Sequence, residues 1–76
     1  MATTKDQIDE LTEALEQTVD PYDRTDLLLQ LAFLYERVDS RRAMDYALKA
    51  QTIAESLEDD ELRARAFMAV ANVQTV

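Results

Sequence analysis

The stretch "RRAMDYALKAQTIAESLEDD", residues 41–60, places four alanines at spacings of four, three and four residues: Ala43, Ala47, Ala50 and Ala54. This spacing puts all four side chains on one side of an α-helix. Because alanine is small, a neighbouring helix can approach that side closely, while larger side chains beside the row interdigitate. The row therefore predicts a helix that contacts neighbours on two sides and is stacked with them in a layer.

The whole chain is predicted to be all-α. It has no glycine and one proline, and its apolar residues recur at helical spacing. Asp20 and Pro21 mark the start of a helix, because Asp caps helices well and proline suits the first helical position. Thr4 and Gln7 have the form of a capping box at the start of an earlier helix. The helices are expected at about residues 5–19, 21–38, 40–57 and 60–75.

The composition excludes several kinds of active site. Without cysteine or histidine, the chain lacks the usual ligands of zinc sites and the pairs that activate a nucleophilic cysteine or serine. Without glycine, it lacks the phosphate-binding loops that need a backbone free of Cβ atoms. We therefore expect a protein that is not an enzyme and that uses no metal and no cofactor.

The net charge of −8 restricts the partners. An acidic surface repels nucleic-acid phosphates and anionic lipids, so the expected partner is a protein or peptide with a neutral or basic surface, not nucleic acid or a membrane. The first residues, "MATTKDQIDE", contain no apolar signal region, and no apolar run is long enough to span a bilayer. These features favour a cytoplasmic location.

A similar segment occurs twice in the sequence. "LLLQLAFLY" (residues 27–35) aligns with "AFMAVANVQ" (residues 66–74) at a shift of 39, and "LTEALEQ" (residues 11–17) aligns with "ALKAQTI" (residues 47–53) at a shift of 36. If A and B denote the two helices of one repeat, the order is B–A–B–A. A period of this length is typical of solenoids built from helical hairpins.

These residues resemble the tetratricopeptide repeat family. Leu28, the pair Leu31-Ala32 and Tyr35 match the pattern of the family's first helix, and the alanines of residues 43–50 match its second. The chain departs from the family where tryptophan, glycine and a closing proline are common. An unrelated four-helix bundle with alanine-rich packing is the alternative. The resemblance implies antiparallel helices stacked as a fragment of a right-handed α-solenoid, with a groove that binds a peptide or helix of a partner.

Carried over from the family, the groove-facing positions combine apolar side chains with charges at the edges. Leu29 and Phe33 are not needed by the family's core, so exposed apolar surface there would mark an interaction site. Alternatively, the first helix or a second copy of the chain covers these two residues. The partner-binding residues are then expected to be Asp26, Leu29, Gln30, Phe33, Arg37, Arg65, Met68, Ala69 and Asn72.

The last expected helix is apolar where a terminal solenoid helix would be polar. Phe67, Val70 and Val73 form its apolar face, and Val76 continues the pattern. We therefore expect that the 76 residues form one domain at the N-terminus of a longer protein, or that the chain associates with itself, as a homodimer, through this face. The first function expected is a non-catalytic protein-interaction module. The alternative is a homo-oligomerisation domain of a larger regulatory or signalling protein.

Overall fold

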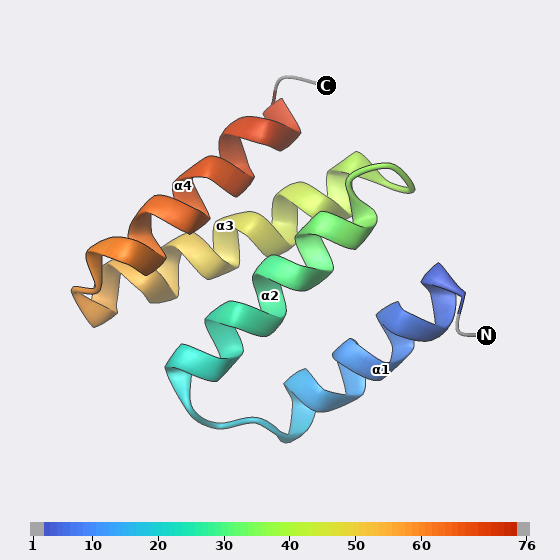
Figure 1. Ribbon diagram of the computed structural model, residues 1–76, viewed down its shortest axis with the longest axis horizontal. Coiled ribbons are helices and arrows are strands. Elements are labelled where there is room, and N and C mark those ends of the chain that lie inside the picture. Colours follow the sequence, from blue (N-terminus) through green and yellow to red (C-terminus); the bar gives the residue numbers. More distant parts are fainter. Residues whose placement is uncertain (1–2, 75–76) are drawn as a thin grey trace.

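The computed structural model describes residues 3–74, and this range contains four α-helices. They are α1 (Thr4–Gln17), α2 (Pro21–Tyr35), α3 (Ser40–Leu57) and α4 (Asp60–Gln74). Successive helices run antiparallel (Figure 1). Helix α2 contacts the three other helices, α3 contacts α2 and α4, and α1 contacts α2 alone within the described range. The predicted all-α, four-helix fold is confirmed.

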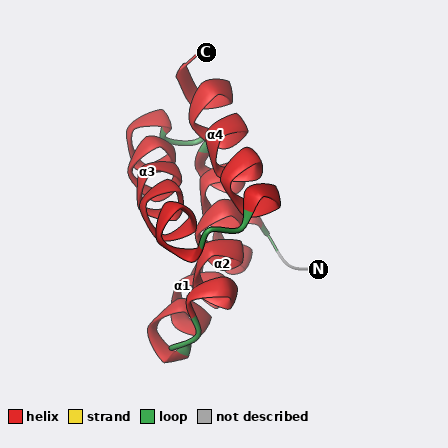
Figure 2. Cartoon of the chain, turned by 90° about the vertical axis from the view of Figure 1, so that its left-hand side faces the viewer, coloured by secondary structure: helices red, strands yellow, loops and turns green. Residues whose placement is uncertain are grey.

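The molecule is flat. Its principal extents are 37 × 31 × 17 Å, so its thickness is less than two helix diameters of about 10 Å each. Helix α3 lies on one side of α2 and α4, and these two helices lie next to each other (Figures 1 and 2). A core between so few layers is thin, so each side chain at the contact of α2, α3 and α4 carries a large share of the packing.

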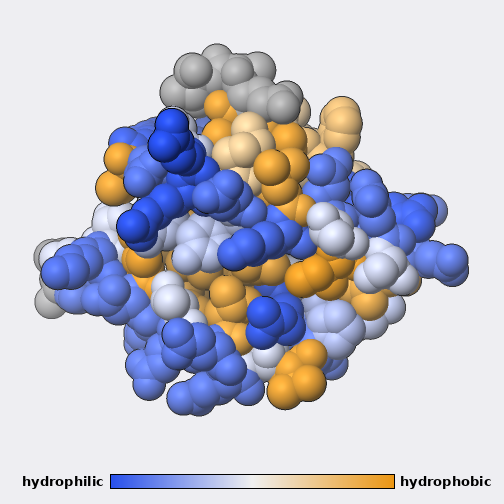
Figure 3. Space-filling model, turned by 180° about the vertical axis from the view of Figure 1, so that it is seen from behind, coloured by the Kyte–Doolittle hydropathy of each residue, from blue (hydrophilic) through white to orange (hydrophobic). Residues whose placement is uncertain are grey.

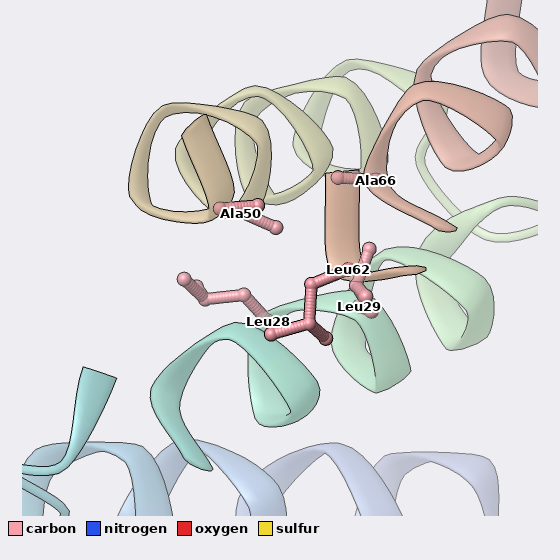
Figure 4. Packing of buried hydrophobic residues seen from close by; sticks show 6 residues of the cluster. Leu28, Leu29, Ala50, Leu62 and Ala66 are labelled. Atoms are coloured by element: carbon pink, nitrogen blue, oxygen red, sulfur yellow. The ribbon is translucent and has the colours of Figure 1, made fainter. Parts of the chain in front are cut away.

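The alanine row of α3 forms the centre of this core. All four alanines are fully buried. Ala50 and Ala54 pack in one cluster with Leu28 and Leu29 of α2 and with Leu62 and Ala66 of α4 (Figure 4). Ala47 packs in a second cluster with Ala32 of α2 and Val70 of α4. The row of small side chains therefore lies against two neighbouring helices, as its spacing predicts.

Helix α1 begins one residue earlier and ends earlier than expected. The capping box is made by Thr3 and not by Thr4: the Thr3 hydroxyl accepts from the Asp6 N–H at 3.2 Å, and the Asp6 carboxylate accepts from the Thr3 N–H at 3.3 Å. At the other end Thr18 is extended, because the chain must reach Asp20, which caps α2. Val19 is consequently exposed and does not extend the apolar stripe of α1.

The ends of α2 and α3 show two different ways of stopping a helix without glycine. Helix α2 ends at Tyr35 and not near residue 38. It is followed by a turn in which the Tyr35 carbonyl accepts from the N–H groups of Val38 and Asp39. Helix α3 ends where Glu58 adopts the left-handed conformation, with φ 56° and ψ 30°. Only glycine takes this conformation without steric cost. Of the expected range 60–75, residues 60–74 are helical, and residue 75 and Val76 lie outside the described residues.

The structure repeats at one shift of 39 residues. Helix α2 (Pro21–Tyr35) moved by 39 coincides with α4 (Asp60–Gln74) at both ends. The same shift places Ile8, Leu11 and Leu15, the large apolar positions of α1, on the buried alanines 47, 50 and 54 of α3. The shift of 36 expected for these helices is therefore wrong, and no insertion separates the two hairpins.

Equivalent polar contacts are found at the turn of each hairpin. Asp20 caps α2 and Asp59 caps α4, each accepting backbone N–H bonds from the first helical turn. Arg24 donates to the carbonyls of Leu15 and Thr18 at 2.9 Å each, and Arg63 donates to the Glu55 carbonyl at 3.1 Å. Both guanidinium groups thus satisfy carbonyls at the C-terminal end of the preceding helix, where a positive charge is favourable.

Aromatic stacking joins α2 to α3. The rings of Tyr35 and Tyr46 stack with centroids 5.5 Å apart and planes inclined by 12°. Arg42 lies over Tyr35 and Lys49 lies over Tyr46. The interaction with Tyr35, followed by the charge of Asp39, raises the pKa of Arg42 above its ordinary value. The stacked rings and the contact of Arg42 with Tyr35 therefore join α3 to α2, whereas Lys49 and Tyr46 both belong to α3.

Candidate functional site

A groove runs along the face formed by α1, α2 and α4. It consists of two adjoining hollows of about 460 and 260 Å³, which share Leu29, Phe33 and Arg65. The first hollow lies between α1 and α2, and the second between α2 and α4. We call the two together the groove. Its lining residues are Gln7, Glu10, Leu11, Leu29, Gln30, Ala32, Phe33, Leu34, Glu36, Arg65, Met68, Ala69, Asn72 and Val73.

Two large apolar side chains are exposed in the groove. Phe33 is 74% exposed and lines both hollows, and Met68 is 61% exposed and lines the second. Leu29, which was expected to be exposed beside Phe33, is only 8% exposed. It belongs to the core cluster with Leu62 and Ala66, because α4 crosses the side of α2 on which Leu29 lies. Leu29 therefore forms the floor of the groove.

Three of the predicted polar positions form one network. Asp26 accepts from Arg65 at 3.1 Å and from the Gln30 side-chain amide at 3.0 Å. Asp26 and Arg65 occupy equivalent positions of α2 and α4, 39 residues apart. Each side chain is about half exposed, so the ion pair contributes little to stability by itself. Its effect on the groove is to hold Arg65 at the junction of the two hollows and to balance its charge.

The remaining predicted positions lie at or near the same face. Ala69 and Asn72 line the second hollow, and Ala69 also packs against the core. Arg37 does not line the groove. It lies in a neighbouring hollow of about 530 Å³, which continues from the groove through Phe33, Glu36 and Asn72. The structure thus brings most of the predicted partner-binding residues to one face and places Arg37 beyond its end.

One wall of the groove was missed by sequence reasoning. Gln7, Glu10 and Leu11 of α1 line the first hollow. Because α1 contacts only α2 among the helices of residues 3–74, it lies beside the groove and leaves Phe33 uncovered. The alternative that α1 covers both Leu29 and Phe33 is therefore wrong. The spacing of Gln7, Glu10 and Leu11 places them on neighbouring positions of one helix, but it does not show where that helix lies relative to α2.

The groove has an acidic character. Its charged lining residues are Glu10, Glu36 and Arg65, and Arg65 is paired with Asp26. Apart from this pair, the charged side chains that line the groove are the carboxylates of Glu10 and Glu36, while Arg37 lies in the neighbouring hollow that Phe33 also lines. This local charge has the same sign as the net charge of the chain. A ligand with basic groups flanking an apolar centre matches this arrangement best.

The apolar face expected on α4 is divided between core and surface. Val70 and Val73 are 8% and 7% exposed, so they are not available to a second copy of the chain. Val70 packs against Ala32 and Ala47 in the second core cluster. Phe67, in contrast, is 64% exposed. The expected self-association face of Phe67, Val70 and Val73 is therefore corrected to an exposed Phe67 alone.

The described residues offer few other features. Within residues 3–74, no group of three or more acidic side chains is close enough to hold a metal ion. No buried side-chain nitrogen or oxygen in this range lacks a hydrogen-bond partner. The helices in the part described are too short or too polar to cross a membrane.

The fold and groove define the chain as a small all-α protein with an apolar, acid-edged groove on three helices. Comparison with protein-family models, with curated proteins and with solved structures gave no match to this chain.

Proposed function

We propose that this chain is a non-catalytic protein-interaction module whose groove binds a helix or extended segment of a partner protein. The proposal is carried mainly by one observation: Phe33 and Met68 are both exposed in the same hollow of the groove. Each lies on a helix that is fixed in the core, so binding would not have to order the backbone beneath them. Apolar side chains on a rigid surface with a polar rim are typical of interaction sites.

The size of the contribution can be worked from the exposed fractions. Full burial of a Phe or Met side chain is worth about 1.5–3 kcal/mol. With the remaining exposure of Phe33 and Met68, a partner that covers both would gain roughly 2–4 kcal/mol. This corresponds to about 30- to 700-fold in Kd. The two side chains are thus sufficient to make the groove the main contact of a partner of modest affinity.

The partner we propose presents an apolar residue between basic ones. The apolar residue would lie against Phe33 above the floor formed by Leu29, and the basic residues would lie near Glu10 and Glu36. These pairs would be at the rim and solvated, so they would affect the association rate and the salt dependence more than the dissociation rate. Binding should therefore weaken as salt is added, without being lost.

Peptide selection from a random library tests the proposal and does not require a named partner. Peptides selected on the full chain should bind Phe33→Asp at least tenfold more weakly, because a charge replaces the central apolar contact. The matched control is Phe67→Asp, which makes the same change at another exposed phenylalanine outside the groove. Selected peptides that bind Phe33→Asp as well as the unchanged chain, or a selection that enriches nothing, would contradict the proposal.

The finer expectations stay predictions. The 39-residue repeat supports a solenoid of helical hairpins, and the burial of Ala43, Ala47 and Ala50 at the matching positions supports the tetratricopeptide resemblance. The right-handed solenoid and the cytoplasmic location follow from that resemblance and from the sequence. Self-association is the alternative function. Sedimentation of the unchanged chain as a dimer that Phe33→Asp converts to a monomer would favour the alternative.

A further inference from the structure

The two hairpins have equivalent backbones and equivalent helix caps, but equivalent side chains on α2 and α4 differ in burial. With the shift of 39 residues, Thr25 and Leu28 of α2 correspond to Ala64 and Phe67 of α4. Thr25 is fully buried and Leu28 is 2% exposed, whereas Ala64 and Phe67 are exposed. The same positions on two equivalent helices are thus covered in one hairpin and open in the other.

Helix α3 covers Leu28 of α2. Leu28 packs against Ala50 and Ala54 of α3, and Figure 4 shows Leu28 reaching toward Ala50. On the rim of this contact, Leu15 of α1 lines a hollow together with Arg24 and Leu28, and the far side of this hollow is formed by Lys49, Thr52 and Ile53 of α3. Bulky Leu28 thus lies against small side chains, and this is how α3 approaches α2 closely.

The equivalent hollow on α4 is open on the side where α3 closes the hollow on α2, as far as residues 3–74 are concerned. It has a volume of about 430 Å³ and is lined by Gln51, Glu55, Arg63, Ala64 and Phe67. Arg63 and Phe67 are the equivalents of Arg24 and Leu28. All five lining residues belong to α3 and α4, and none of the other helices reaches this side within residues 3–74. Figure 3 shows the face of the molecule opposite to that of Figure 1, on which apolar side chains reach the surface between polar ones.

We infer that α4 binds a further helix across Ala64 and Phe67, antiparallel to α4, as α2 binds α3. The repeat also indicates the surface of that helix. Because Leu28 is accommodated by a row of alanines, the larger Phe67 needs a partner helix with small side chains at spacings of four, three and four residues. Its flanks would be polar, since Glu55 and Arg63 border the hollow. This site is separate from the groove and does not depend on the proposed function.

The helix of this chain that carries such a surface is α3 itself, so a peptide with the sequence of residues 40–57 is a suitable probe. The peptide, with both ends blocked, is added to the isotope-labelled full chain, and amide shifts are followed by NMR. We expect saturable shifts around Phe67, with a Kd no weaker than about 1 mM. Phe67→Asp should weaken binding at least tenfold. Phe33→Asp, the matched control in the groove, should leave it unchanged.

A second peptide tests the requirement for small side chains. Replacing Ala50 and Ala54 by leucine in the probe should reduce its affinity at least tenfold, because bulky side chains would meet the ring of Phe67. Equal binding of both peptides would overturn the inference about the partner surface. Absence of saturable shifts at this concentration would overturn the site itself.

Two other occupants have distinct outcomes. If the peptide replaces the chain's own α3, shifts will spread over α2 and will be insensitive to Phe67→Asp, which overturns the inference. If a second copy of the chain occupies the site, sedimentation will show association that depends on concentration and is lost with Phe67→Asp. That result would overturn the assignment to a separate helix. If Phe33→Asp does not weaken the binding of peptides to the groove, the proposed function is contradicted, but the inference about Phe67 is not.

Discussion

Replacing Ala50 by leucine should destabilise the fold, because Ala50 lies where three helices meet. It is fully buried on α3, in one cluster with Leu28 and Leu29 of α2 and with Leu62 and Ala66 of α4. Neighbours on two helices leave no open direction for three additional carbon atoms. Overpacking of this kind forces strained rotamers or moves the backbone, at a net cost of about 1–3 kcal/mol.

The sign of the change in the free energy of unfolding distinguishes close packing around Ala50 from an unfilled cavity there. If a cavity existed beside Ala50, three additional buried carbons would stabilise the fold by up to about 2.4 kcal/mol, at about 0.8 kcal/mol for each. A domain of this length has a total stability of about 4–11 kcal/mol. The expected loss is therefore a large fraction of the total and should lower Tm by roughly 4–8 °C for each kcal/mol.

Urea unfolding followed by far-UV circular dichroism measures the effect. Ala64→Leu is the matched control, because Ala64 is exposed on α4 and the same change there should stay within about 0.5 kcal/mol. Adding Leu62→Ala to Ala50→Leu removes volume from the same cluster and should recover part of the loss. Unchanged or increased stability of Ala50→Leu, with the control also unchanged, would refute close packing along the alanine row.

Three further predictions concern helix ends and the surface ion pair. Arg24→Met removes two hydrogen bonds to the carbonyls of Leu15 and Thr18, so it should lower the free energy of unfolding by about 1–3 kcal/mol. Amide hydrogen exchange should then accelerate in α1 more than in α3. Glu58→Gly should stabilise the fold by about 0.5–1 kcal/mol, because glycine adopts the left-handed conformation without steric cost; an unfolding midpoint below that of the unchanged chain would contradict this. A double-mutant cycle with Asp26→Asn and Arg65→Gln should give a coupling below about 1 kcal/mol that decreases with salt; a larger coupling insensitive to salt would show a pair shielded from solvent.

The fold could be predicted largely because its determinants are local. The spacing of the alanines between residues 43 and 54 identified the central helix and its buried side, and Asp20 with Pro21 identified the start of α2. The ends of α1 and α2 could not be placed to the residue. Val19 and Val38 continue the apolar pattern, but the chain must leave the helix to reach the next cap, and both side chains are exposed.

The groove was predicted less completely, since it depends on how helices cross. The positions on α2 and α4 followed from helical spacing, and most of them lie on the predicted face. Leu29 was misplaced because α2 is apolar on most sides, so its sequence does not distinguish a covered side from an open one. The part played by Glu10 could not be seen from spacing alone, because it requires the angle at which α1 lies beside α2.

The case of α4 shows the limit of periodicity as a guide to function. Phe67 and Val70 are three residues apart and belong to one apolar pattern, yet Val70 is buried and Phe67 is exposed. A pattern reports which residues share a side of a helix; burial depends on whether another helix lies against that side. In α2 the equivalent of Phe67 is covered by α3, and the coordinates show this difference where the sequence shows similarity. Because Phe33 and Phe67 lie on different surfaces, substitutions at the two positions report independently on two contacts with other molecules.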